Sequence, residues 1–334
     1  MKRYDSLNGV RAISCIGILL MHVLSNSEYE LHPVATIIIE KFTNFVFLFM
    51  VLSAFSMCCG YFDKIKNNKI SMEDFYKKRI KKILPFFSLL VVLDIIIEHS
   101  FASLVEGFAD VTMLFGFLPN EITVIGVGWF IGLVFIFYLM FPFFVYLFSN
   151  KKRAWITTLI ALLMNISCIA YFNVGRTNMF YSFLFFCIGG LVFIYKENLI
   201  ELFKTSRFFA LMMLLASTGL FFLPFDNEYL LVGQIIIYSV IFVIYAIAFD
   251  KSILNNKLAS FIGSISLEIY LSHMIVFRVL EKTNLLNFIN NPYLAYIANC
   301  LIVLLGTILI AKCYKFFESA ISKKVLKNEN IVSK

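Results

Sequence analysis

Residues 126–148 read GVGWFIGLVFIFYLMFPFFVYLF, and no charged side chain interrupts them. A run of about 20 apolar residues is long enough to cross the hydrocarbon core of a bilayer as an α-helix. Working outward from this stretch, comparable apolar runs recur along the whole chain. They fall at about 8–25, 36–60, 84–98, 154–172, 178–195, 208–223, 229–249, 260–281 and 293–317. The sequence therefore predicts an all-α, polytopic membrane protein with about ten transmembrane helices.

The overall composition supports this class. Hydrophobic residues make up 60% of the chain and charged residues only 15%, whereas soluble domains have about 45–50% apolar and about 25% charged residues. A soluble domain of this length has too much surface to hide so many apolar side chains. The net charge of +8 is explained by basic loops on the cytoplasmic side of a membrane, so we do not expect nucleic acid as a partner.

The basic residues also predict an orientation. With the N-terminus inside the cell, most of the 29 Lys and Arg residues fall in cytoplasmic segments, as the positive-inside rule requires. An even number of spans preserves this bias and places the C-terminus inside as well. We therefore expect residues 1–334 to form one transmembrane domain that ends in a short cytoplasmic tail at 319–334. The richness in Ile, Lys, Asn and Phe is typical of AT-rich bacterial genomes, which suggests a bacterial plasma membrane.

Two connections are longer than the others. Residues 62–82 are expected to form a basic inner loop, and residues 101–125 an acidic or neutral outer one. Within the outer connection, 101–119 is weakly apolar and carries Glu106 and Asp110, which favours an interfacial or re-entrant segment over another span.

The first apolar run contains two ionisable side chains, Arg11 and His22. At about 100° per residue both project from the same helix face, and they are about 16 Å apart along its axis. Arg11 is then near the inner surface and His22 near the middle of the membrane or beyond it. Arg11 reaching the inner headgroups and His22 bonding a neighbouring helix would be a structural explanation. The alignment favours a path for an anionic ligand that enters from the cytoplasm.

Other polar side chains lie inside apolar runs, where they are costly and therefore candidates for function. They are Ser53, Asp94, Trp129, Tyr138, Glu268, Tyr270 and His273. His273 is either a partner of His22 or a structural hydrogen bonder. The seven Cys residues show no metal-ligand spacing, and no metal site is predicted.

A basic cluster precedes the third run. It includes Lys78, Arg79, Lys81 and Lys82, followed by Pro85. Such a cluster is either a headgroup anchor and topology signal or a phosphate-binding site.

Several of these residues together resemble the membrane-bound acyltransferase family 3, whose members transfer acyl groups, often acetyl, to sugars and polysaccharides. The matching elements follow the same order along almost the entire chain. They are Asp5 with Arg11-Ala12 and His22; Phe49, Ser53 and Phe55, with Ala54 in place of Gly; the basic residues Lys78-Arg79 and Lys81-Lys82 before Ile83-Leu84-Pro85; Trp129, Tyr138 and Pro142; Gly263, Ser266, Tyr270 and His273; and the closing Phe317-Glu318. Many members carry Glu where this chain has Val134, which puts any mechanism relying on that carboxylate in doubt.

The resemblance implies an O-acyltransferase that uses acetyl-CoA or another acyl-CoA from the cytoplasm. Arg11 and the basic cluster of Lys78, Arg79, Lys81 and Lys82 would meet the CoA phosphates. His22 would act as general base on an acceptor hydroxyl or accept the acyl group itself.

The remaining candidates follow from the same resemblance. His273 or Ser53 would orient the imidazole or the carbonyl, and Trp129, Tyr138 and Tyr270 would bind substrate. The expected acceptor is a capsular or cell-wall polysaccharide or a lipid-linked oligosaccharide. A transporter or flippase of a lipid-linked sugar, or a structural membrane protein, would carry similar buried polar groups.

Overall fold

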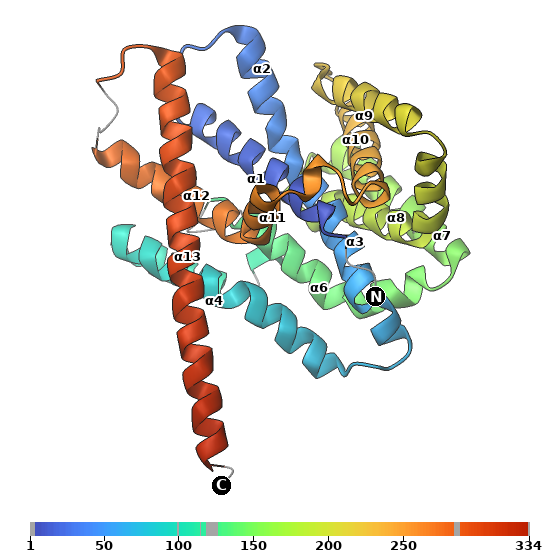
Figure 1. The fold of residues 1–334 in the computed structure, drawn as a ribbon, viewed down its shortest axis with the longest axis horizontal. Coiled ribbons are helices and arrows are strands. Elements are labelled where there is room, and N and C mark those ends of the chain that lie inside the picture. The colour runs from blue at the N-terminus through green and yellow to red at the C-terminus, as the bar shows by residue number, and fades with distance from the viewer. Residues whose placement is uncertain (1–3, 99, 114, 118–125, 284–287, 333–334) are drawn as a thin grey trace.

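The computed structural model describes residues 4–98, 100–113, 115–117, 126–283 and 288–332, and this part of the chain contains helices and no strand. Figure 1 shows helices gathered into two groups. The first half of the chain forms α1 (Ser6–Ser25), α2 (Pro33–Lys41), α3 (Phe45–Lys66), α4 (Met72–Glu98), α5 (Phe101–Val111) and α6 (Trp129–Phe148). The second half forms α7 (Lys151–Ser167), α8 (Met179–Thr205), α9 (Arg207–Phe222), α10 (Glu228–Ala248), α11 (Lys257–Ser264), α12 (Ser266–Thr283) and α13 (Pro292–Val332).

The predicted class, an all-α membrane protein, is confirmed. In the described residues, fewer helices than the ten predicted are long and apolar enough to span a membrane. Seven helices in the described part are long and apolar enough to cross a membrane, or eight if the bent pair of α11 and α12 counts as one. Helix α9 has only 16 residues, and α4 carries cations through its first half. The count of ten spans and the cytoplasmic location of both termini therefore stay predictions.

The prediction that residues 62–82 form a long basic inner loop is wrong. Helix α3 continues to Lys66, α4 begins at Met72, and only the residues between them connect the two helices. The charged stretch favours helix because Lys, Arg and Glu lose little rotamer freedom there, and Glu73 and Asp74 occupy the first turn, where acidic groups are stabilising. The cations of this stretch therefore have fixed positions on a helix surface.

The outer segment predicted at 101–119 is helical in its first part. Helix α5 leaves Phe101, Leu104 and Phe108 exposed, which fits a helix lying along the membrane interface. Asp110, on the same helix, is fully buried. The remainder, from residue 118 to 125, lies outside the described residues.

Helices α7, α8, α9 and α10 lie together on one side of the molecule, and α3 packs against this group (Figure 1). Asn and Ser side chains cap the starts of several of these helices by accepting backbone N–H bonds. These caps are Asn150 for α7, Asn178 for α8, Ser206 for α9, Asn227 for α10 and Asn256 for α11. Gly189 of α8 lies so near Val51 of α3 that a Cβ would stand 2.3 Å from the Val51 carbonyl oxygen, so this pair of helices crosses closely.

The second group contains α1, α12 and α13 with the short helix α11. Helices α11 and α12 meet at a bend of 70°. Gly263, just before the bend, lies against the backbone of α1, where a Cβ would stand 2.0 Å from the Asn8 carbonyl oxygen. In α4, Asp94 is buried and accepts a 2.6 Å bond from Arg278 of α12, which accounts for this intramembrane carboxylate without a catalytic role.

Candidate active site

A cavity of about 570 Å³ opens where the second helix group meets α3, α4 and α6. Helices α1, α3, α4, α6, α11, α12 and α13 all contribute to its wall. Its polar lining consists of Asn8, Arg11, Ser53, Ser56, Arg79, Lys82, Tyr138, Ser264, Ser266, Glu268, Tyr270, Tyr314, Lys315 and Glu318. Six residues singled out from the sequence as site residues, namely Arg11, Ser53, Arg79, Lys82, Tyr138 and Tyr270, thus share one cavity.

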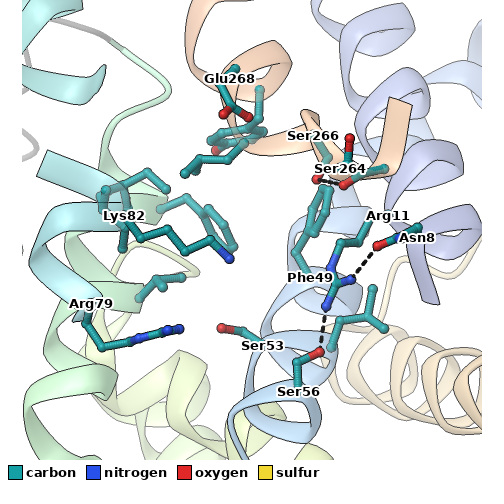
Figure 2. A pocket seen from close by; sticks show the side chains of 18 of the residues that line it. Asn8, Arg11, Phe49, Ser53, Ser56, Arg79, Lys82, Ser264, Ser266 and Glu268 are labelled. Atoms are coloured by element: carbon teal, nitrogen blue, oxygen red, sulfur yellow. Dashed lines mark hydrogen bonds between the residues drawn. The ribbon is translucent and has the colours of Figure 1, made fainter. Parts of the chain in front are cut away.

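Arg11 enters the cavity from α1. Its guanidinium donates a 3.0 Å hydrogen bond to Asn8 Oδ1 and a 2.6 Å hydrogen bond to Ser56 Oγ of α3. Both bonds are drawn in Figure 2. They tie the planar group to two helices, which limits the rotamer freedom that binding an anion would otherwise cost. Arg11 is therefore a pre-positioned cation in the cavity wall rather than a side chain that extends to the headgroups.

Two cations of the basic cluster face Arg11 from α4. Figure 2 shows Arg79 and Lys82 pointing across the cavity. Arg79 donates a 2.7 Å bond to Tyr61 Oη and lies over the Tyr61 ring at 4.6 Å. Lys78 and Lys81 are exposed and do not line the cavity. The two members of each pair are about one helical turn apart, so residues 79 and 82 share one face, and residues 78 and 81 share a face about 100° around the helix.

A fourth cation comes from α13. Lys315 lies in the cavity wall, 3.4 Å from Glu268 Oε1 and 3.2 Å from the Ser264 carbonyl oxygen. The sequence indicated only that Lys315 is one of several basic residues near the C-terminus. The bend between α11 and α12 exposes the Ser264 carbonyl to this contact, and no local sequence pattern links positions 264 and 315.

The central wall of the cavity holds Ser53 of α3 and Tyr138 of α6, whose hydroxyl oxygens are 3.2 Å apart. Ser53 therefore belongs to the cavity wall, to which neither His22 nor His273 contributes. Val134, which replaces the family carboxylate, lines the same cavity. Glu268 and Glu318 are the carboxylates in its lining.

His22 and His273 form a separate pair, with ring centroids 5.1 Å apart. Nδ1 of His273 lies 2.6 Å from the Tyr270 carbonyl oxygen. A carbonyl can only accept, so Nδ1 donates and Nε2 keeps its lone pair. Nε2 is buried, and no group in the described part of the chain hydrogen-bonds to it. The pair thus joins a partly exposed imidazole to a fully buried one of fixed tautomer.

Aromatic rings separate the cavity from the histidines. Phe49, Phe130 and Tyr270 line the cavity, and their ring centroids lie 5.3–6.3 Å from one another. The other side of the Tyr270 ring meets His273, at a centroid distance of 6.0 Å. Tyr270 Oη donates to the Val127 carbonyl oxygen at 3.0 Å, which fixes the ring between the two compartments. We refer to these three residues as the aromatic partition.

Trp129 lies on the histidine side of this partition. It begins α6, does not line the cavity, and contacts Phe130 at a centroid distance of 6.0 Å. Among the described residues there is no cluster of His, Cys, Asp and Glu with the geometry of a metal site.

One comparison with known proteins decides the family. A family profile described as an acyltransferase domain, the acyltransferase family 3 domain, matches residues 4–312. The chain belongs to acyltransferase family 3. No curated protein and no solved structure gives a match to the chain. The matched region includes the whole cavity lining up to residue 312 and both histidines, so the acyltransferase domain and the site described above coincide. Tyr314, Lys315 and Glu318 lie just beyond it.

Within this acyltransferase domain the structure groups the predicted site residues into two sets. Arg11, Ser53, Arg79, Lys82 and Tyr138 surround the cavity. His22, His273 and Trp129 lie beyond the aromatic partition, to which Tyr270 itself belongs. Lys78 and Lys81 join neither set.

Proposed function

We propose that this acyltransferase moves an acetyl or other acyl group from a cytoplasmic acyl-CoA to a hydroxyl of a cell-envelope sugar or polysaccharide, in a bacterial plasma membrane. The main support for this proposal is that four cations from three helices line one cavity, namely Arg11, Arg79, Lys82 and Lys315. A coenzyme A molecule bears several phosphate charges, and Arg and Lys donors bind phosphate with charge-assisted hydrogen bonds. The four cations supply such donors on opposite walls of the cavity.

The distances support a path from this cavity to His22. Arg11 and His22 are about 16 Å apart along α1, a span comparable to an extended pantetheine arm. The phosphates would bind near Arg11, and the thioester would reach the aromatic partition. A small movement of Phe49, Phe130 or Tyr270 would then bring the acyl carbonyl to His22.

His22 is proposed as the general base. Its imidazole takes the proton of the acceptor hydroxyl, the hydroxyl oxygen attacks the thioester carbonyl, and the C–S bond breaks as the proton passes to the departing CoA thiolate. His273 holds a fixed tautomer beside it and orients the His22 ring. In the alternative route His22 first accepts the acyl group and then gives it to the acceptor. Both routes leave the same products, an acylated hydroxyl and free CoA.

Substituting the cavity cations tests the donor site. Arg11→Ala and Lys82→Ala are each expected to raise the KM for acetyl-CoA about tenfold or more, because each removes a charge-assisted contact worth about 1.5–3 kcal/mol. Lys78→Ala is the matched control, since Lys78 belongs to the same basic cluster but does not line the cavity. The measurement is transfer of radiolabelled acetyl to envelope glycan in membranes. Equal KM values for all three variants would contradict a CoA site in this cavity.

A flippase for a lipid-linked sugar is the second candidate, because the polar groups lie on both sides of an aromatic partition, as in a transport path. The same experiment separates the two functions. A wild-type protein that transfers no label to any envelope glycan would favour the flippase.

A further inference from the structure

Arg176 is a basic side chain that does not line the cavity and has no role in the mechanism above. It belongs to the connection between α7 and α8, which begins after the short π-helix Cys168–Phe172 and ends at the Asn178 cap of α8. This end of the bundle also holds Thr43, in the short 3-10 helix Phe42–Asn44 just before α3, and Trp129, at the start of α6. Arg176 is partly buried there.

The position of Arg176 is fixed by its neighbours. Its guanidinium donates to Thr43 Oγ1 and lies over the Trp129 ring, 5.6 Å from the centroid. Its own carbonyl accepts a 2.6 Å bond from Ser182 Oγ of α8. Asn173 adopts a left-handed conformation, with φ 52°, that ends the preceding helical turn. Backbone and side chain are thus both held, as expected of a binding group and not of a mobile loop residue.

Successive ring contacts connect Arg176 to the proposed catalytic pair. Trp129 contacts Phe130 at 6.0 Å, Phe130 contacts Tyr270 at 5.3 Å, and Tyr270 contacts His273 at 6.0 Å between centroids. Arg176 is also close enough to His22 and Tyr270 for direct electrostatic interaction. A ligand held by Arg176 and Trp129 would therefore have other groups near His22.

No carboxylate in the described part of the chain forms an ion pair with Arg176. Arg278 and Lys315, by contrast, are paired with Asp94 and Glu268. Glu228, at the start of α10, is exposed, and both Glu228 and Arg176 interact electrostatically with Tyr181. Glu228 is nevertheless not within ion-pair distance of Arg176. A partly buried guanidinium without a protein counter-ion suits a bidentate carboxylate or phosphate ligand.

We propose that the acceptor is an anionic glycan, carrying a carboxylate or phosphate group, and that Arg176 binds this group while Trp129 packs against the sugar ring. The inference rests on the proposed function and names the acceptor class for it. Arg176 is a binding residue only: the new bond joins the acceptor hydroxyl oxygen to the acyl carbon, and the guanidinium stays unchanged.

The test uses the full-length protein reconstituted in phosphatidylcholine vesicles, with radiolabelled acetyl-CoA. The acceptor is envelope glycan separated by anion exchange into retained and unretained fractions. Part of the retained fraction is neutralised by carbodiimide–borohydride reduction of carboxylates and hydrogen fluoride removal of phosphates. We expect label in the retained fraction, a strong decrease after neutralisation, and with Arg176→Gln a rise of about tenfold or more in the KM for the retained glycan.

Two comparisons make the readout specific to Arg176. The KM for acetyl-CoA is expected to stay unchanged in Arg176→Gln, and Arg176→Lys should recover part of the glycan affinity because it keeps the charge. Arg207→Gln is the matched control: Arg207 is exposed at the start of α9 and lies over Phe249 instead. A structural defect would alter both KM values and kcat together, which would contradict the proposal.

Other outcomes also decide the question. Label in the unretained fraction, or equal KM values for wild type and Arg176→Gln, would overturn the anionic acceptor. If Arg176 binds a lipid headgroup instead, adding phosphatidylglycerol to the vesicles would stimulate the wild type but not Arg176→Gln, with no preference for charged glycan. No transfer by the wild type to any fraction would overturn the proposed function itself and this inference with it.

Discussion

Replacing His22 with Gln is expected to lower the kcat of acetyl transfer by about 10²–10⁴-fold, the usual contribution of a positioned general base. Gln keeps much of the shape of the side chain but cannot accept the proton of the acceptor hydroxyl. The KM for acetyl-CoA should change little, because His22 does not line the cavity that holds the cations. Initial rates of label transfer at varied acetyl-CoA concentrations separate these two effects.

His32→Ala is the matched control for this experiment. His32 follows His22 along the chain, but its side chain only caps α2 by accepting from the Val34 N–H, at 3.3 Å. Its loss should cost about 1 kcal/mol of helix stability and leave kcat near the wild-type value. A His22→Gln protein that folds and transfers acetyl at the wild-type rate would remove His22 from the mechanism. Recovery of radiolabelled, acylated protein from the wild type but not from His22→Gln would instead favour the acyl-enzyme route.

Replacing Gly263 with Ala is expected to destabilise the protein by about 3 kcal/mol, at the upper end for overpacking. The added Cβ would stand 2.0 Å from the Asn8 carbonyl oxygen, and backbone cannot move aside as a flexible side chain can. Helix α1 would have to shift away from α11, which displaces Arg11 and His22 together. Thermal unfolding in detergent measures the loss of stability. Acetyl-transfer kinetics measure the rise in the KM for acetyl-CoA and the fall in kcat.

Gly233→Ala provides the comparison. Gly233 lies within α10, and a Cβ there would meet no other atom within 4 Å. Ala in a helix is favoured over Gly by about 0.5–1 kcal/mol, so this variant should be as stable as the wild type or slightly more so. If Gly263→Ala unfolds at the same temperature as Gly233→Ala, the close crossing of α1 and α11 does not determine stability.

The sequence was most informative where a single helix carried the signal. Arg11 and His22 occupy one apolar run, so helical geometry alone predicts that they share a face and lie about 16 Å apart along the axis. His273 was singled out as a polar residue inside another apolar run, either a partner of His22 or a structural hydrogen bonder, and the structure places the two ring centroids 5.1 Å apart. The pairing itself joins α1 to α12, and only the fold brings such distant segments together.

The basic cluster shows where sequence reasoning was incomplete. Treating residues 62–82 as a loop made Lys78, Arg79, Lys81 and Lys82 equivalent. Once α4 is known to begin at Met72, the periodicity of 3.6 assigns Arg79 and Lys82 to the face that lines the cavity. The sequence contains this periodicity, but the high density of charged residues is more typical of a loop and obscures it.

Lys315 and Arg176 could not have been found in the same way. Lys315 reaches the cavity because α13 packs against α12, and its contact with Glu268 joins residues that are far apart in the sequence. Arg176 lies between the apolar runs 154–172 and 178–195, and no local sequence pattern sets it apart. Both depend on long-range packing, which local pattern does not encode.

The aromatic partition of Phe49, Phe130 and Tyr270 has a consequence for the energetics of the host cell. A protein that receives a charged donor from one face and a hydrated sugar from the other would otherwise provide a continuous aqueous route between them. Under the proposed function, the three packed rings would interrupt any row of water molecules along which protons hop. The acyl group would then cross as a small uncharged moiety while the proton-motive force of the cell is maintained.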